Sequence, residues 1–276
     1  MRIVAAAMQL NSADDKAANI AEAEAAIARA GAAGARLVVL PELWTYLGRQ
    51  EGNQRNAEPV PGPVTARLAA LAREHRLILH GGSMLEAAPN AQGDPRPRNT
   101  TVVFDTEGTL AATYRKIHLF DAAPGDRAAI YRESATTAPG DAVVSVTIDG
   151  MPLGLAICYD LRFPELFRAL ALAGAQVIVL PAAFTAETGR DHWEPLLRAR
   201  AIENGCYVVA AGQAGAHPPG RRCWGHSMIV DPWGDILADA GDAPGGMALA
   251  ELDLARVADV RRRLPSLANR RPDLYG

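Results

Sequence analysis

The strongest constraint on the fold is an alternation of helical segments with short, wholly apolar strands, which occurs in both halves of the chain. Residues 11–35 are alanine-rich and helical in pattern, and the apolar run "RLVVLPEL" follows at 36–43. In the second half, a helical pattern over 164–175 precedes "QVIVLPAAF" at 176–184. Strands that are apolar on both sides must be covered on both faces of their sheet. The alternation therefore predicts buried sheets in an α/β protein.

Two hairpin patterns, one in each half, indicate that the second half of the chain repeats the first. "TVVFDTEGTLAAT" at 101–113 and "HSMIVDPWGDILADA" at 226–240 are similar in length and in pattern. Two such halves, each a mixed sheet with helices outside, would pack face to face as a four-layer α-β-β-α sandwich. No stretch with the composition of a linker divides the chain, so we expect a single domain over residues 1–276.

Composition narrows the class of protein. About half of the 276 residues are apolar, 21% are charged and the net charge is −3. These values are typical of a soluble globular protein and do not favour nucleic-acid binding. No run is long enough to cross a bilayer, and the start "MRIVAAAMQL" is expected to be a first strand rather than a signal peptide. Three widely spaced cysteines do not form a disulfide framework, so we expect a cytoplasmic protein.

Glu42 follows directly after the apolar run of the first half, whereas the matching position of the second half is Ala182. A glutamate here is either a solvated loop residue or a functional group, because ligands bind at the carboxyl ends of buried strands in α/β proteins. A carboxylate at such a strand end is a candidate general base. The lack of an acid at position 182 favours an asymmetric site around Glu42.

Lys116 lies in "YRKIH", at the end of the second strand of the first hairpin. Arg115 precedes it, and adjacent strand residues point to opposite faces of a sheet. Both cations are solvated if this is an exposed edge; otherwise one of them points inward. A buried lysine needs a carboxylate partner to offset its desolvation, and Glu42 could provide one.

Cys158 ends the apolar run of "GLAICYDLRFPEL" at 154–166. Free cysteines are among the most buried residues, so an inert core thiol is one interpretation. The sharp turn into a helix resembles the bend that presents a nucleophile, and a nearby helix start and lysine would lower the pKa of the thiol. Cys206 begins an apolar strand and is expected in the core, and Cys223 is expected in a loop. The six histidines show no metal-ligand spacing, so we expect no metal site.

Three motifs in order, "LPELW", "YRKIHLFD" and "GLAICYDLRFPEL", resemble those of the nitrilase, or carbon–nitrogen hydrolase, superfamily. The resemblance extends over essentially the whole chain and implies the same four-layer sandwich. By position, it makes Glu42 the general base, Lys116 the stabiliser of the oxyanion and Cys158 the nucleophile. It also implies that Glu133 positions Lys116 or the substrate amide, and that the backbone N–H of Tyr159 helps to hold the oxyanion.

The resemblance further implies an amidase that converts a terminal carboxamide to a carboxylate and ammonia through a thioester intermediate, without any cofactor. Arg162 is either a cation for a substrate carboxylate or a surface arginine at a helix start. The family also implies a homodimer or a larger assembly. The polar segment 264–276 is expected either to pack across a subunit interface or to fray.

The substrate is suggested by a finer resemblance. The segments 192–213, 225–234 and 261–276 are most similar to amidases that act on deaminated glutathione, as is "LWTYLGRQ" at 43–50. Omega-amidases, which hydrolyse 2-oxoglutaramate and 2-oxosuccinamate, share much of this pattern. A third reading is a catalytically silent member that binds a metabolite or a partner. The partner expected in the first two readings is a small-molecule amide, with no nucleic acid and no membrane.

Overall fold

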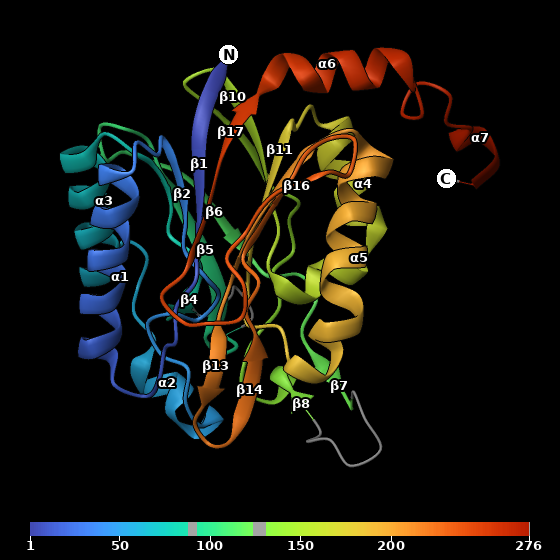
Figure 1. Cartoon of the computed structure of the whole chain (residues 1–276). Helices are drawn as coiled ribbons and strands as arrows, with labels where there is room; N and C mark the ends of the chain where they lie inside the picture. Colours follow the sequence, from blue (N-terminus) through green and yellow to red (C-terminus); the bar gives the residue numbers. More distant parts are fainter. Residues whose placement is uncertain (88–92, 124–130, 276) are drawn as a thin grey trace.

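The chain folds around two β-sheets that pack face to face, as the computed structural model shows for residues 1–87, 93–123 and 131–275 (Figure 1). The larger sheet has the order β17-β1-β2-β3-β5-β4, and β6 pairs with β5. The bounds of its strands are β1 (Arg2–Met8), β2 (Leu37–Val39), β3 (Ile78–His80), β4 (Met84–Glu86), β5 (Arg98–Phe104), β6 (Leu110–Arg115) and β17 (Met247–Asp253).

The smaller sheet contributes the second inner layer, in the order β16-β15-β12-β11-β10-β9. Its strands are β9 (Ser145–Ile148), β10 (Met151–Leu155), β11 (Val177–Ala182), β12 (Tyr207–Gly212), β15 (Met228–Val230) and β16 (Ile236–Asp239). Strands β1 and β2 of the larger sheet contact β12 and β11 of the smaller one. Two short hairpins lie apart from both sheets: β7 (Asp121–Ala122) with β8 (Tyr131–Arg132), and β13 (Ala214–His217) with β14 (Arg221–Trp224).

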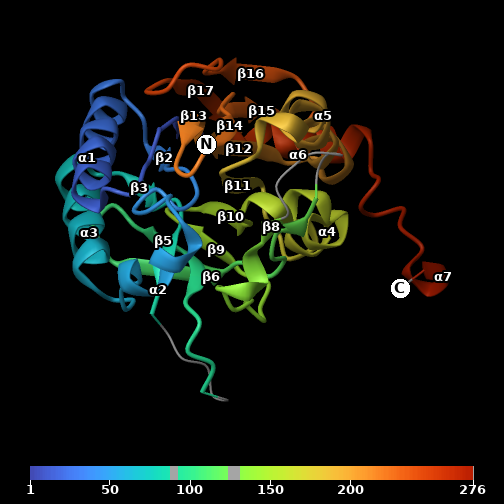
Figure 2. The ribbon, with the colours of Figure 1, turned by 90° about the horizontal axis from the view of Figure 1, so that it is seen from below.

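Helices form the two outer layers (Figures 1 and 2). The larger sheet is covered by α1 (Lys16–Ala32) and α3 (Pro63–His75), and the smaller sheet by α4 (Pro164–Leu172) and α5 (Ala186–Asn204). The remaining helical segments are shorter or lie outside these layers: η1 (Gln50–Gly52), α2 (Asn53–Asn56), η2 (Glu133–Ala135), η3 (Cys158–Arg162), α6 (Leu254–Arg263) and α7 (Pro272–Tyr275). The result is the four-layer α-β-β-α sandwich expected from the sequence.

The burial of β1 shows why its strand pattern is continuously apolar. Ala5 and Ala7 belong to the core between the two sheets, whereas Ala6 and Met8 belong to the core beneath α1 and α3. Successive side chains on a strand point to opposite faces, so both faces of β1 are buried. The same alternation occurs in β2. The apolar runs therefore report burial on two sides.

Parallel pairing positions the ends of the central strands. Strands β1, β2 and β3 are parallel to one another, and so are β10, β11 and β12. Glu42 follows β2, Cys158 follows β10, and Ala183 follows β11. Because β2 also contacts β11 across the sandwich, the carboxyl ends of strands from both sheets meet at one place.

The segment after α6 leaves the body of the sandwich (Figures 1 and 2). The exposed fractions of Leu264 and Leu274 are 53% and 70%. A role of residues 264–276 in a subunit interface, and the homodimer itself, stay predictions, as does a cytoplasmic location. Within the described parts of the chain, every helix is too short or too polar to pass through a bilayer.

Candidate active site

Four side chains that the sequence singled out line one cavity. Glu42, Lys116, Glu133 and Cys158 all border a cavity of about 680 Å³ that is open to solvent. The exposed fractions of Glu42, Lys116 and Cys158 are only 3%, 2% and 8%. Glu42 is therefore not a solvated loop residue. Of the two neighbouring cations, Lys116 points inward, while Arg115 pairs with Glu86.

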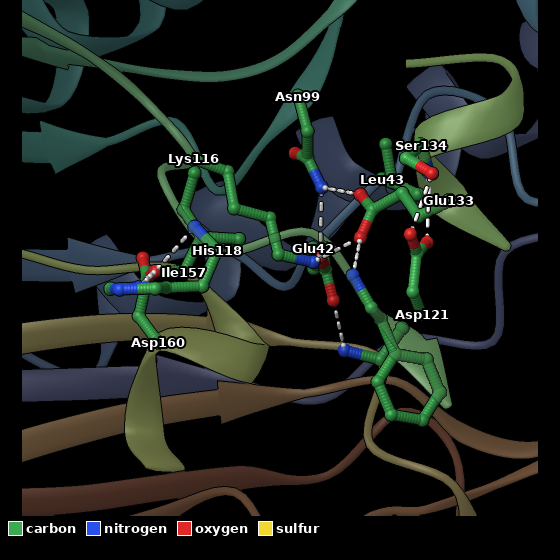
Figure 3. A network of polar contacts seen from close by, with 12 residues as sticks. Glu42, Leu43, Asn99, Lys116, His118, Asp121, Glu133, Ser134, Ile157 and Asp160 are labelled. Atoms are coloured by element: carbon green, nitrogen blue, oxygen red, sulfur yellow. Dashed lines mark hydrogen bonds and ion pairs between the residues drawn. The ribbon is translucent and has the colours of Figure 1, made fainter. Parts of the chain in front are cut away.

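Three donors hold the carboxylate of Glu42 (Figure 3). Oε1 accepts hydrogen bonds from Lys116 Nζ at 2.9 Å and from Asn99 Nδ2 at 2.8 Å. Oε2 accepts a hydrogen bond from the backbone N–H of Ala183 at 2.7 Å. Lys116 comes from the end of β6, Asn99 from β5 and Ala183 from the segment after β11. The orientation of this carboxylate is therefore determined by both sheets.

Lys116 is held between two carboxylates. Its Nζ lies 2.8 Å from Glu133 Oε2, which also accepts a hydrogen bond from the backbone N–H of Phe120 at 2.7 Å. Burial would lower the pKa of Lys116, but the carboxylates of Glu133 and Glu42 outweigh it and hold this pKa well above its ordinary value. Lys116 is therefore a permanently charged group aimed at the cavity.

The thiol of Cys158 differs from expectation. Burial and the carboxylate of Glu42 raise its pKa well above the usual value, and the opposing effect of Lys116 is smaller. The lowered pKa expected from a nearby lysine and helix start is therefore wrong, because desolvation of the thiolate and the adjacent anion dominate. At neutral pH this site holds a thiol that needs a base, and Glu42 is close enough to accept its proton.

This electrostatic arrangement gives a prediction for thiol titration. In a protein whose other two cysteines are replaced by alanine, we expect the Cys158 thiol to titrate above about pH 9, the upper end of the ordinary thiol range. Glu42→Gln should lower this pKa because it removes an anion, and Lys116→Met should raise it because it removes a cation. Ultraviolet absorbance of the thiolate measures both shifts. Equal pKa values in the two variants would contradict the assignment of causes.

A buried carboxylate fixes the turn that presents Cys158. The φ angle of Cys158 is 46°, a left-handed conformation that is uncommon for a residue other than glycine. Asp160 accepts hydrogen bonds from the backbone N–H of Ile157 at 2.8 Å and from the hydroxyl of Tyr114 at 2.7 Å. Its other oxygen lies 2.7 Å from His118 Nδ1 (Figure 3). These contacts support the sharp bend expected at the end of the strand.

Arg162 borders a second cavity, of about 230 Å³, that also includes Cys158 and Tyr159. Its guanidinium lies 5.1 Å from the centroid of the Phe184 ring, and Nη1 lies 3.2 Å from His192 Nδ1. Arg162 is thus half-buried beside the thiol rather than on an open surface. Substrate binding by Arg162 and by the backbone N–H of Tyr159 stays a prediction.

Sequence reasoning missed several residues of the site. Asn99 contacts both Glu42 and Glu133, and only its position at the start of a strand before an apolar run marked it. Asp160 lies within the motif "GLAICYDLRFPEL", but nothing in that motif indicated a function for it. Arg221 borders the larger cavity and carried no recognisable signal.

The other two cysteines lie apart from the cluster of Glu42, Lys116, Glu133 and Cys158. Cys206 is fully buried, as expected, and lies 2.9 Å from Arg261 Nη2. Cys223 is not in a loop but in β14, where it is buried and pairs with Gly215. In residues 1–87, 93–123 and 131–275, no group of three or more His, Cys, Asp or Glu side chains is arranged to hold a metal ion.

Comparison with known proteins gives consistent matches. Residues 4–262 match the family model described as carbon-nitrogen hydrolase. A deaminated glutathione amidase from Bos taurus is 43% identical over 274 residues, covering 98% of this chain and 83% of that protein. The omega-amidase NIT2 from Homo sapiens is 38% identical over 271 residues, covering 98% of this chain and 95% of that protein.

Two solved structures share the fold. The NitFhit protein of C. elegans superposes with a TM-score of 0.87 and 38% identity, covering 100% of this chain and 66% of that one. A mutant amidase from Nesterenkonia sp. AN1, in which acrylamide has added to the active-site cysteine, superposes with a TM-score of 0.80 and 29% identity. It covers 99% of this chain and 98% of its own. Sequence and structure together therefore establish that this chain belongs to the carbon–nitrogen hydrolase family.

Proposed function

We propose that the protein is a cysteine-dependent amidase in which Glu42, Lys116 and Cys158 carry out the reaction. The observation that carries this proposal is the buried cluster itself. A protonated thiol lies beside a carboxylate that can accept its proton, and a lysine that stays charged points into the same cavity. A nucleophile, a base and an oxyanion stabiliser are the groups that acyl transfer requires.

In the first half of the reaction, Glu42 takes the proton of the Cys158 thiol as Sγ bonds to the amide carbon. The carbonyl oxygen becomes an oxyanion, which Lys116 Nζ and the backbone N–H of Tyr159 stabilise. The C–N bond then breaks, and Glu42 returns the proton to the leaving nitrogen. The product is a thioester on Cys158 and a free amine or ammonia.

In the second half, Glu42 acts as a base again. It takes a proton from water as the water oxygen bonds to the thioester carbon, and Lys116 again faces the oxyanion. The C–S bond breaks, the carboxylic acid leaves, and Cys158 recovers its proton from Glu42. Glu133 positions Lys116 through its 2.8 Å contact and touches none of the reacting atoms in this scheme.

The substrate that we propose is deaminated glutathione, with Arg162 binding the carboxylate of its 2-oxo acid end. The 43% identity to an amidase of that name supports this choice, as does the position of Arg162 beside Cys158 at the smaller cavity. Glutathione joins its glutamyl side chain to the cysteine nitrogen, so the leaving group here is cysteinylglycine. The release of ammonia expected from the sequence applies to primary amides instead.

The second candidate is an omega-amidase acting on 2-oxoglutaramate or 2-oxosuccinamate. The 38% identity to an omega-amidase favours it. Both candidates use the same acyl chemistry. Deaminated glutathione and 2-oxoglutaramate share their acyl group and differ only in the leaving group, which is a dipeptide amine in the first and ammonia in the second.

A substrate panel separates these candidates. Deaminated glutathione and 2-oxoglutaramate both yield 2-oxoglutarate, so one assay of that product compares their kcat/KM values directly. We expect deaminated glutathione to exceed 2-oxoglutaramate by ~10-fold or more, the factor that one additional charged hydrogen bond supplies. A preference for 2-oxoglutaramate identifies an omega-amidase. A protein that hydrolyses no amide, and whose Cys158 is alkylated no faster than Cys206, is the catalytically silent member.

A further inference from the structure

Cys158 lies between two cavities of unequal size, each bordered by one arginine. The larger cavity contains Arg221, and the smaller one contains Arg162. Cys158, Phe120, Ala183 and Thr185 border both. An amide bound at the thiol therefore has room on either side of its scissile bond.

The positions of the catalytic groups indicate which side receives the leaving group. Glu42 and Lys116 border the larger cavity and do not border the smaller one. In the proposed reaction Glu42 returns its proton to the leaving nitrogen, so this nitrogen must face the larger cavity. The acyl part then lies in the smaller cavity beside Arg162.

Arg221 borders the larger cavity and is held in place by a contact with another lining residue. It lies at the start of β14, at the end of the sandwich where β8 and α2 also lie (Figure 1). Its Nη2 donates a hydrogen bond to the backbone oxygen of Gly48 at 2.6 Å, which joins β14 to the segment after Glu42. An isolated antiparallel β-bridge between Cys223 and Thr185 holds the same strand beside Thr185, which borders both cavities.

The charges of the larger cavity make Arg221 the cation that is available to bind an anionic group. Lys116 is already paired with Glu42 and Glu133, so one cation there faces two carboxylates. Within the part of the chain that the structure describes, Arg221 forms no ion pair with Asp or Glu, and it is half-buried. An anionic group entering this cavity therefore needs Arg221 as its partner. A guanidinium is suited to binding a carboxylate.

We propose that Arg221 binds the terminal carboxylate of the leaving group and selects amides whose amine carries such a carboxylate. This inference rests on the proposed amidase function and deepens it. In deaminated glutathione, the group bound would be the glycine carboxylate of cysteinylglycine. Arg162 and Arg221 then hold the two ends of the substrate, one on each side of Cys158. Ammonia carries no such group, so Arg221 distinguishes the longer substrate from 2-oxoglutaramate.

The test compares deaminated glutathione with its C-terminal carboxamide, in which the glycine carboxylate is replaced. The wild-type protein should prefer the carboxylate form by ~10- to 100-fold in kcat/KM, the range for one hydrogen bond to a charged group. In Arg221→Gln this preference should fall to about 1- to 3-fold, since the uncharged side chain no longer distinguishes the two ends. Arg221→Lys should keep part of it. Because each preference is a ratio measured on one protein, any loss that affects both compounds equally cancels.

Arg222→Gln is the matched control. Arg222 is the next residue on β14, is exposed and points to the other side of the strand, so this variant should keep the wild-type preference. An unchanged preference in Arg221→Gln overturns the inference, as does a wild-type protein without any preference. A wild-type protein that hydrolyses 2-oxoglutaramate but not deaminated glutathione overturns it and retains the amidase chemistry. A protein inactive on all three compounds refutes the proposed function as well.

Discussion

Replacing Cys158 with alanine is expected to abolish amide hydrolysis, with kcat falling by ~10⁴-fold or more, as for nucleophiles of other acyl-transfer enzymes. Glu42 and Lys116 cannot replace the thiol, because the proposed thioester forms on Sγ alone. The fold should persist. Alanine keeps the Cβ atom at the left-handed backbone position, and the lost sulfur borders an open cavity rather than a sealed core.

Mass spectrometry of protein quenched during turnover checks this prediction. The wild-type protein should gain the mass of an acyl group on Cys158, and the variant should gain none. Cys206→Ala is the matched control, since Cys206 lies in the core and does not border the cavity. This control should keep both the acyl intermediate and the activity. Activity of the Cys158 variant above about one hundredth of wild type would refute the assignment of the nucleophile.

Lys116→Met is expected to have two separate effects. The kcat/KM value should fall by ~10³-fold, because the main cation facing the oxyanion is lost. The free energy of unfolding should fall by about 3–5 kcal/mol, because the buried carboxylate of Glu42 and the half-buried carboxylate of Glu133 lose their shared partner. Chemical denaturation measures the second effect and steady-state kinetics the first.

A second substitution separates these two effects. In Lys116→Met combined with Glu133→Gln, one of the two repelling carboxylates is removed, so part of the lost stability should return. Activity should not return, because no cation faces the oxyanion. A double variant that recovers activity together with stability would mean that Lys116 acts only through folding. A double variant less stable than Lys116→Met would contradict the electrostatic explanation.

The internal repeat of the chain could be recognised from the sequence, and one position at which the two halves differ pointed to the site. Glu42 follows β2, and the matching strand β11 ends at Ala182 rather than at an acid. In the structure, the segment after β11 instead supplies the N–H of Ala183 to Glu42 Oε2. One half of the repeat thus provides a carboxylate, and the other half provides a donor that orients it.

The charges around the Cys158 thiol were less predictable from the sequence than the position of Cys158 at the end of a strand. The motif around Cys158 suggested a lysine that lowers the pKa of the thiol. The structure shows that Lys116 is already shared between Glu42 and Glu133, and that the thiol is buried beside one of these carboxylates. The effect of a neighbour on a pKa depends on the number of charges present and on the loss of water. Neither can be counted from one motif.

The sequence by itself determined the layers, the central strands and the candidates Glu42, Lys116 and Cys158, because burial periodicity and strand ends are local properties of the chain. Only the tertiary structure decided the donors around Glu42, the role of Asn99 and the place of Arg221 opposite Gly48. Those contacts join residues 57 and 173 positions apart. Their partners are set by how strands from two sheets cross, and no spacing along the chain records that geometry.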